Sequence, residues 1–187
     1  MTEPVRVAYL TGEYPRATDT WIQREVAGLR RRGVDVPASR VVVAPGAKPI
    51  VAYALQAVAD PGDEIIVPDP GCPIYASVAR FLDLEPVPLP LRPSNDFRPD
   101  LDELRALISR RTRMLVINSP HNPTGGMLTR SDLEGIAAIA MAHDLLVLTD
   151  EIYGRLVHEG EHHSLLAVDG MACLLYTSDA ADERVRV

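Results

Sequence analysis

Two polar loops carry the side chains best suited to chemistry, and each loop directly follows a short apolar run. Residues 118–125 read Asn-Ser-Pro-His-Asn-Pro-Thr-Gly, and residues 149–153 read Thr-Asp-Glu-Ile-Tyr. The first loop offers the carboxamide of Asn122 on a rigid turn, and the second offers a carboxylate, Asp150, three residues before a phenol, Tyr153. Ligands of parallel α/β sheets bind outside the carboxyl ends of the strands. Both loops are therefore candidates for a small-molecule site.

A third candidate motif lies upstream. Gly46, Ala47 and Lys48 lie where a predicted strand turns into a predicted helix. Free backbone amides and the helix dipole at such a point favour an anion such as a phosphate. The same residues also fit an ordinary glycine turn that starts a helix, and the motif taken alone favours that simpler interpretation. The agreement of three motifs, all at the ends of predicted strands, is stronger than any one of them.

The elements that must position these motifs alternate along the chain. Continuous apolar runs of strand length occur at residues 41–43, 65–67, 114–117 and 145–148. Helical patterns separate them, at residues 47–58, 74–82, from Asp100 onward, and 131–143. Such uninterrupted runs indicate strands that are buried on both faces. The alternation therefore predicts an α/β fold, with a mostly parallel sheet and helices on both faces.

Two other stretches have their own predictions. A strand-loop-helix unit is expected before the sheet, because residues 5–10 are apolar and Thr20 with Gln23 fits a capping box for a following helix. Four prolines, Pro86, Pro88, Pro90 and Pro93, predict a stiff connection.

Several polar residues also have simpler interpretations. Asp150 could cap the turn that follows its strand, and the turn that holds Asn122 is a common one when taken alone. The histidines at 121, 158, 162 and 163 follow no standard ligand spacing, so they are interpreted as solvated loop residues and no metal site is predicted.

Together, the two loops resemble the cofactor pocket of a fold type I, class I/II aminotransferase of the aspartate aminotransferase-like kind. The resemblance covers roughly residues 37–171 and includes residues 68–75, Pro-Asp-Pro-Gly-Cys-Pro-Ile-Tyr. It implies a partial large domain of that fold, with pyridoxal 5'-phosphate (PLP) as the cofactor. Lys48 and Ala47 would then hold the phosphate, and Asn122 and Tyr153 would bind the phenolic oxygen.

The resemblance gives Asp150 and Cys72 separate roles. Asp150 would pair with the pyridine nitrogen and keep it protonated, so that the ring can act as an electron sink. Cys72 falls where the family places an aromatic ring over the cofactor. A sulfur atom can contact a ring face but gives less contact area, and Cys72 could equally be a small buried filler. Tyr75 is expected in the core rather than against the cofactor.

The family's chemistry needs a lysine that holds the cofactor as a Schiff base. Lys48 is the only lysine in the chain, and it lies in a different motif. The sequence therefore offers no catalytic residue, and we expect this polypeptide to have little or no activity. The parent reaction implied by the resemblance moves an amino group from an amino acid to a 2-oxo acid, in a family that is usually homodimeric. A non-catalytic PLP-binding protein is an alternative.

Both ends of the chain look foreign to this family. Residues 1–36 resemble the start of a GT-B glycosyltransferase, which makes a glycosyltransferase fragment a further alternative. Residues 173–183 resemble a translated sequencing adapter. The sequence thus predicts three parts: a foreign segment at 1–36, a partial aminotransferase large domain at 37–172, and an artefactual tail at 173–187.

Composition excludes other classes of function. The net charge of −7 argues against a surface that binds nucleic acid or anionic membranes. The first residues lack the basic and apolar regions of a secretory signal. We therefore expect a cytoplasmic protein.

Overall fold

A computed structural model describes residues 47–154, 156–168, 171 and 175–178. The predicted strand-loop-helix unit at 1–36 and the predicted strand at 41–43 lie outside the described residues. The elements run in the order α2 (Ala47–Val58), β1 (Glu64–Asp69), α3 (Pro73–Phe81), β2 (Glu85–Pro90), η2 (Pro93–Asn95), α4 (Leu101–Leu107), β3 (Thr112–Asn118), α5 (Arg130–His143), β4 (Leu146–Asp150), η3 (Leu165–Ala167) and β5 (Leu175–Ser178).

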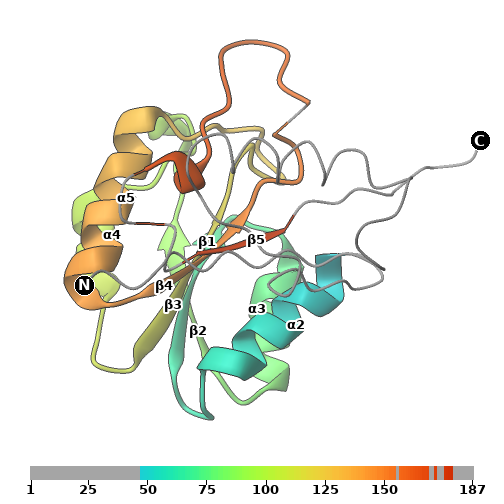
Figure 1. Ribbon diagram of the computed structural model, residues 1–187, viewed down its shortest axis with the longest axis vertical. Helices are drawn as coiled ribbons and strands as arrows, with labels where there is room; N and C mark the ends of the chain where they lie inside the picture. The colour runs from blue at the N-terminus through green and yellow to red at the C-terminus, as the bar shows by residue number, and fades with distance from the viewer. Residues whose placement is uncertain (1–46, 155, 169–170, 172–174, 179–187) are drawn as a thin grey trace, which may run out of the picture.

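Five strands form one sheet in the order β2-β1-β3-β4-β5, and all neighbouring pairs are parallel. Helices α4 and α5 cover one face, and α2 and α3 cover the other (Figure 1). The predicted α/β fold is confirmed. Because the strands are parallel, β1, β3 and β4 all end at one edge, which we call the carboxyl edge; Asp69, Asn118 and Asp150 are their last residues.

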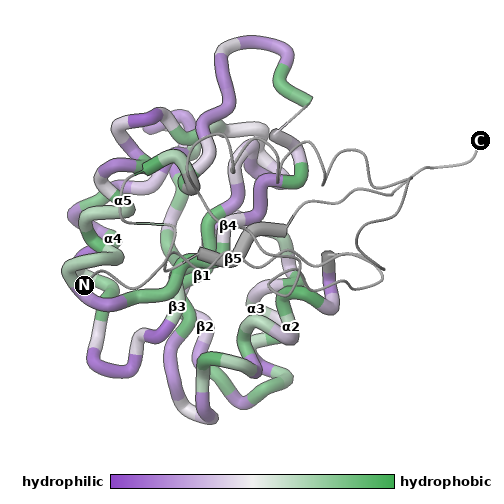
Figure 2. Tube along the Cα trace, in the orientation of Figure 1, coloured by the Kyte–Doolittle hydropathy of each residue, from purple (hydrophilic) through white to green (hydrophobic). Residues whose placement is uncertain are grey.

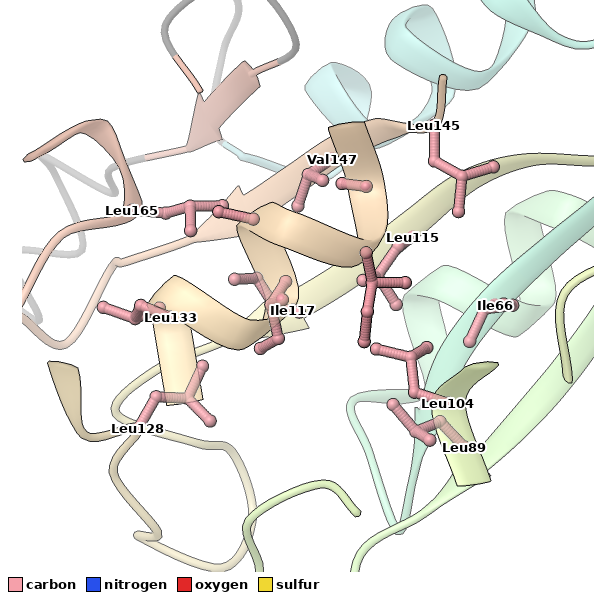
Figure 3. Packing of buried hydrophobic residues seen from close by; sticks show 14 of the residues in the cluster. Ile66, Leu89, Leu104, Leu115, Ile117, Leu128, Leu133, Leu145, Val147 and Leu165 are labelled. Carbon is pink, nitrogen blue, oxygen red and sulfur yellow. The ribbon is translucent and has the colours of Figure 1, made fainter. Parts of the chain in front are cut away.

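The strands separate two apolar clusters because successive side chains point to opposite faces. In β3, Leu115 and Ile117 belong to the cluster under α4 and α5, whereas Met114 and Val116 belong to the cluster under α2 and α3. Figure 3 shows the first cluster, in which Leu104 of α4 and Leu133 of α5 lie with strand residues such as Leu115 and Ile117. Hydrophilic stretches lie mainly in the connecting loops (Figure 2). This burial on both faces explains the uninterrupted apolar runs of the sequence.

The proline-rich stretch is a strand, and the prediction of a stiff connection was wrong. Residues 85–90 form β2 and pair in parallel with β1. Pro86, Pro88 and Pro90 are two residues apart, so the backbone nitrogens that lack a hydrogen all point to the same side. The amides of the alternate residues face β1, as the bonds from Glu85 to the Asp63 carbonyl and from Leu91 to the Asp69 carbonyl indicate, at 2.8 and 2.7 Å. Prolines are tolerated here because β2 is an edge strand of the described sheet.

Helix caps refine the predicted boundaries. The Asp100 side chain accepts hydrogen bonds from the amides of Asp102 and Glu103, at 2.8 and 3.0 Å, as its position before α4 predicted. Helix α5 begins one residue earlier than predicted, at Arg130, because Thr129 and Asp132 form a capping box. Within the described ranges, no helix is long and apolar enough to cross a membrane.

Residues 175–178, inside the predicted artefactual tail, form β5. This strand pairs with β4 in the register Val147 to Leu175 through Asp150 to Ser178. The tail thus extends the sheet beside the strand that carries Asp150, and its artefactual origin stays a prediction.

Candidate functional site

The two predicted loops meet at the carboxyl edge, where Asn118 of β3 is directly opposite Asp150 of β4. The Asn118 side chain joins them. Its Nδ2 donates to the Asp150 carbonyl at 2.8 Å, and its Oδ1 accepts from the Asn122 amide at 2.7 Å. The Ser119 amide also donates to the Asp150 carbonyl, at 3.1 Å. Sequence reasoning named Asn118 only as part of a motif and missed this bridging role. Its position as the last residue of a buried strand was the available signal.

Internal hydrogen bonds hold the first loop in shape. The His121 amide donates to the Gly126 carbonyl at 2.8 Å, and the Gly125 amide donates to the His121 carbonyl at 2.7 Å. His121 Nδ1 and Thr124 Oγ1 share a hydrogen bond of 2.7 Å. Gly125 has a φ of +75°, which agrees with the turn expected from its sequence. The loop therefore presents the half-buried Asn122 on a closed turn.

His121 is buried, and the interpretation of it as a solvated loop histidine was wrong. Its side chain is 5% exposed, and burial lowers its pKa below the usual value. Its Nε2 has no hydrogen-bond partner among the described residues. The ring lines a cavity of about 20 Å³ beneath the loop, together with mostly apolar side chains. A space of that size holds about one water molecule, so this cavity is too small for a cofactor.

Tyr75 holds the carboxylate of the second loop. Its hydroxyl donates to Asp150 Oδ2 at 2.6 Å, and the Ile152 amide donates to Asp150 Oδ1 at 3.3 Å. The second contact is the turn cap considered from sequence. The first was not predicted. Asp150 remains only partly buried, so its carboxylate is fixed in direction yet open to a ligand.

Tyr75 also marks where three predicted site residues converge. Burial is the main cause that raises the pKa of the Tyr75 phenol well above its usual value. The charge of Asp150 and the hydrogen bond to it raise that pKa further, and Cys72 and Tyr153 lie near enough to add to the effect. The side chain is 1% exposed and packs in the cluster under α2 and α3, so the expectation of a core residue is confirmed.

Cys72 and Lys48 occupy helix starts. Cys72 is the N-cap residue of α3, half-buried, and packed against the apolar cluster that contains Tyr75. Ala47 and Lys48 open α2, and Lys48 is exposed. Helix α2 leads into β1 through the short turn at residues 59–63, so it runs antiparallel to β1 and its amino end lies toward the carboxyl edge. Among the described residues, no hydrogen bond joins Lys48 to the two loops.

The described residues do not gather metal ligands. No group of three or more His, Cys, Asp or Glu side chains within these ranges is placed to hold a metal ion. Three of the predicted site residues, Cys72, Asp150 and Tyr153, lie around Tyr75, and the Asn118 side chain connects Asn122 to them.

The chain resembles known aminotransferases over most of its length. The family model for aminotransferase class I and II matches residues 13–178. The arginine–pyruvate transaminase of Pseudomonas aeruginosa is 43% identical over 143 residues, which cover 76% of this chain and 36% of that protein. The aspartate aminotransferase of Pyrococcus abyssi is 37% identical over 136 residues, which cover 72% of this chain and 35% of that protein.

Solved structures agree with these relatives. The N-succinyldiaminopimelate aminotransferase of Mycobacterium tuberculosis matches with a TM-score of 0.76 and 40% identity, covering 83% of this chain and 42% of that one. The aspartate aminotransferase of Thermus thermophilus with maleate matches with a TM-score of 0.75 and 35% identity, covering 83% and 41%.

The matches cover only part of each relative's length. The chain spans less than half the length of the curated relatives it matches. The boundaries predicted at residues 36 and 172 both fall inside the range matched by the family model and stay predictions. Because that model covers well over half of the chain, the chain belongs to the class I and II aminotransferases, a family that uses PLP.

Proposed function

We propose that the carboxyl edge of this sheet is part of a PLP site, and that the whole protein transfers an amino group from an amino acid to a 2-oxo acid. The Asn118 bridge is the observation that carries the proposal. It ties Asn122 and Asp150, which come from different loops, into one rigid unit with bonds of 2.7 and 2.8 Å. A site that binds a cofactor in one orientation needs contact residues that are held at fixed positions relative to one another.

The polar groups at this edge fit the cofactor. The Asp150 carboxylate, held by Tyr75 and Ile152, would pair with a protonated pyridine nitrogen. Within the described ranges, no hydrogen bond engages the carboxamide of Asn122 or the hydroxyl of Tyr153, which leaves both groups available for the phenolic oxygen. All three side chains are partly buried, so they are fixed by their surroundings and still within reach of a ligand.

The remaining contacts are proposed from helix starts. Ala47 and Lys48, in the first turn of α2, would hold the phosphate through free amides and the lysine charge. Cys72, at the start of α3, would lie against a face of the cofactor ring.

When bound, PLP supplies a protonated ring that accepts electron density from the α-carbon of an amino acid. The residues of this chain would bind and orient it. Asp150 would keep the proton at the ring nitrogen, and Asn122 and Tyr153 would orient the phenolic oxygen. Lys48 is the only lysine in these 187 residues, and we assign it to the phosphate. No other lysine is left here for the Schiff base that the family chemistry requires. We therefore propose that a polypeptide of this sequence binds PLP without catalysing transamination.

A PLP titration of the full 187-residue polypeptide tests this proposal. We expect saturable binding, which Asp150→Asn weakens by about tenfold or more because a charge-assisted hydrogen bond is lost. Borohydride treatment followed by mass spectrometry should show no stoichiometric PLP adduct, because the exposed Lys48 can form only an adventitious imine. Binding that is unchanged in Asp150→Asn would contradict the proposed site.

A whole protein that binds PLP without catalysis is the second candidate, motivated by the single lysine, Lys48, in these 187 residues. Addition of amino acids to the PLP-loaded whole protein separates the two ideas, because a spectral change that cycles with amino acid and 2-oxo acid requires transamination. The 187-residue polypeptide should show no such cycling under either idea. The glycosyltransferase alternative rests on residues 1–36, outside the described ranges. For the whole protein we propose the homodimeric state and the cytoplasmic location expected from the resemblance.

A further inference from the structure

Glu151 directly follows Asp150, and the proposed cofactor contacts do not use it. Its side chain is only 13% exposed. One carboxylate oxygen, Oε1, accepts hydrogen bonds from the hydroxyls of Thr149 and Ser164, at 3.1 and 3.0 Å, and from the Leu165 amide at 3.3 Å. The other oxygen, Oε2, accepts from His162 Nε2 at 3.2 Å. This carboxylate therefore ties the far end of the loop, residues 162–165, to the end of β4.

These hydrogen bonds matter for stability because the Glu151 carboxylate is largely buried. A carboxylate removed from water is costly unless hydrogen bonds replace its hydration. Four donors replace it here, and three of them come from residues 11 to 14 positions later in the chain. If the loop opened, the carboxylate would lose these donors together. The Glu151 side chain thus connects residues 162–165 to the end of β4 through three hydrogen bonds.

His162, which is hydrogen-bonded to Glu151, also contacts Gly154, the residue that follows Tyr153. A Cβ atom at Gly154 would lie 2.9 Å from both Cδ2 and Nε2 of His162, and 3.1 Å from the Glu151 carbonyl. The imidazole therefore packs directly on the Gly154 backbone. The Gly154 amide donates to the Glu151 carbonyl at 2.8 Å, and the Leu156 amide donates to the Tyr153 carbonyl at 2.8 Å. Tyr153 lies inside this turn, between Glu151 and Gly154 in the sequence.

We propose that Glu151 and His162 form a clamp that positions the Tyr153 phenol at the carboxyl edge. Both are positioning residues, since they act on the ligand only through Tyr153. The importance of the clamp for cofactor binding rests on the proposed function, whereas its effect on Tyr153 does not.

The first test reads Tyr153 directly, without ligand. The full chain is labelled with ¹³C at the tyrosine ζ carbon, and Tyr153→Phe identifies the Tyr153 signal. Glu151→Gln keeps the shape and an acceptor for Thr149, Ser164 and Leu165, but changes the contact with His162. We expect it, and His162→Ala, to shift or broaden the Tyr153 signal. His162→Gln should restore it, because its amide can donate from nearly the same place. The matched control is Glu161→Gln, an exposed carboxylate in the same loop, which should leave the signal unchanged.

Circular dichroism shows whether each variant folds. If Glu151→Gln does not fold, His162→Ala and His162→Gln carry the comparison. A Tyr153 signal that is unchanged in the folded variants, or unchanged by His162→Ala alone, would overturn the clamp.

The second test measures PLP affinity by equilibrium dialysis. We expect Glu151→Gln and His162→Ala to weaken binding about three- to tenfold, which is part of the value of one charge-assisted hydrogen bond, with His162→Gln close to wild type. Failure of the two proposals is distinguishable. If the wild-type chain binds no PLP, the proposed function fails and the clamp is judged by the tyrosine signal. If PLP binds and the tyrosine signal moves without a change in affinity, Tyr153 is positioned but does not contribute to binding.

Discussion

Tyr75 donates a hydrogen bond of 2.6 Å to Oδ2 of Asp150, across 75 positions of the sequence. The phenol reaches this carboxylate from the core under α2 and α3, where it is fully buried. A core residue thus determines the direction of the carboxylate that we assign to the pyridine nitrogen. This relationship links the stability of the fold to the geometry of the proposed site.

Replacing Tyr75 with Phe should destabilise the chain. The change removes a hydrogen bond to a charged group and leaves one carboxylate oxygen without its buried donor. We expect a loss of about 1–3 kcal/mol in the free energy of unfolding, measured by urea denaturation. Tyr53→Phe is the matched control, because Tyr53 is 53% exposed on α2. Equal stability of the two variants would contradict a structural role for the bond.

Alkaline pH should act through the same phenol. The pKa of Tyr75 is raised in the folded chain above its usual value of 10.0, mainly by burial and then by Asp150. The folded state therefore holds this proton more tightly than the unfolded state. Its contribution to stability is full below pH 10.0 and is lost as the pH rises above that value. We expect wild type to lose more unfolding free energy than Tyr75→Phe between pH 9 and 11. Parallel pH profiles would refute this prediction.

Asn118→Asp should separate the two loops at their bridge. An aspartate can still accept from the Asn122 amide, but it cannot donate to the Asp150 carbonyl. Because Asn118 is 6% exposed, the new carboxylate is buried against the Asp150 carbonyl, which keeps only the Ser119 amide as a donor, and we expect a cost of about 1–3 kcal/mol. PLP affinity should fall in parallel. Gln56→Glu makes the same amide-to-acid change at an exposed position of α2 and should have little effect. A stable Asn118→Asp chain with wild-type affinity would remove the main support for the proposed site.

His121 should make stability depend on pH near neutrality. Burial lowers its pKa in the folded chain below the usual 6.5, so the unfolded state binds the proton more readily. Its contribution is therefore full above pH 6.5 and is lost as the pH falls through the folded pKa. His121→Asn keeps an acceptor or donor for Thr124 and removes the titrating group. We expect its stability to fall less than that of wild type between pH 7 and 5. His158→Asn, at an exposed loop position, should retain the wild-type profile.

Local sequence patterns predicted the elements that have local causes. The apolar runs at 65–67, 114–117 and 145–148 became β1, β3 and β4. Asp100 caps α4 as its spacing predicted. The proline stretch failed because the tolerance of β2 for proline depends on its place at an edge of the sheet, and no local pattern carries that information.

The site divides in the same way. The sequence by itself determined the two loops, their position after buried strands and the family they resemble, because these depend on residue types at short spacing. Only the tertiary structure decided which side chains form hydrogen bonds with one another. Asn118 joins both loops, Tyr75 anchors Asp150, and Glu151 binds His162. The physical reason is that a hydrogen bond across 75 positions, or between neighbouring strands, depends on register and packing, which are set only when the whole sheet forms.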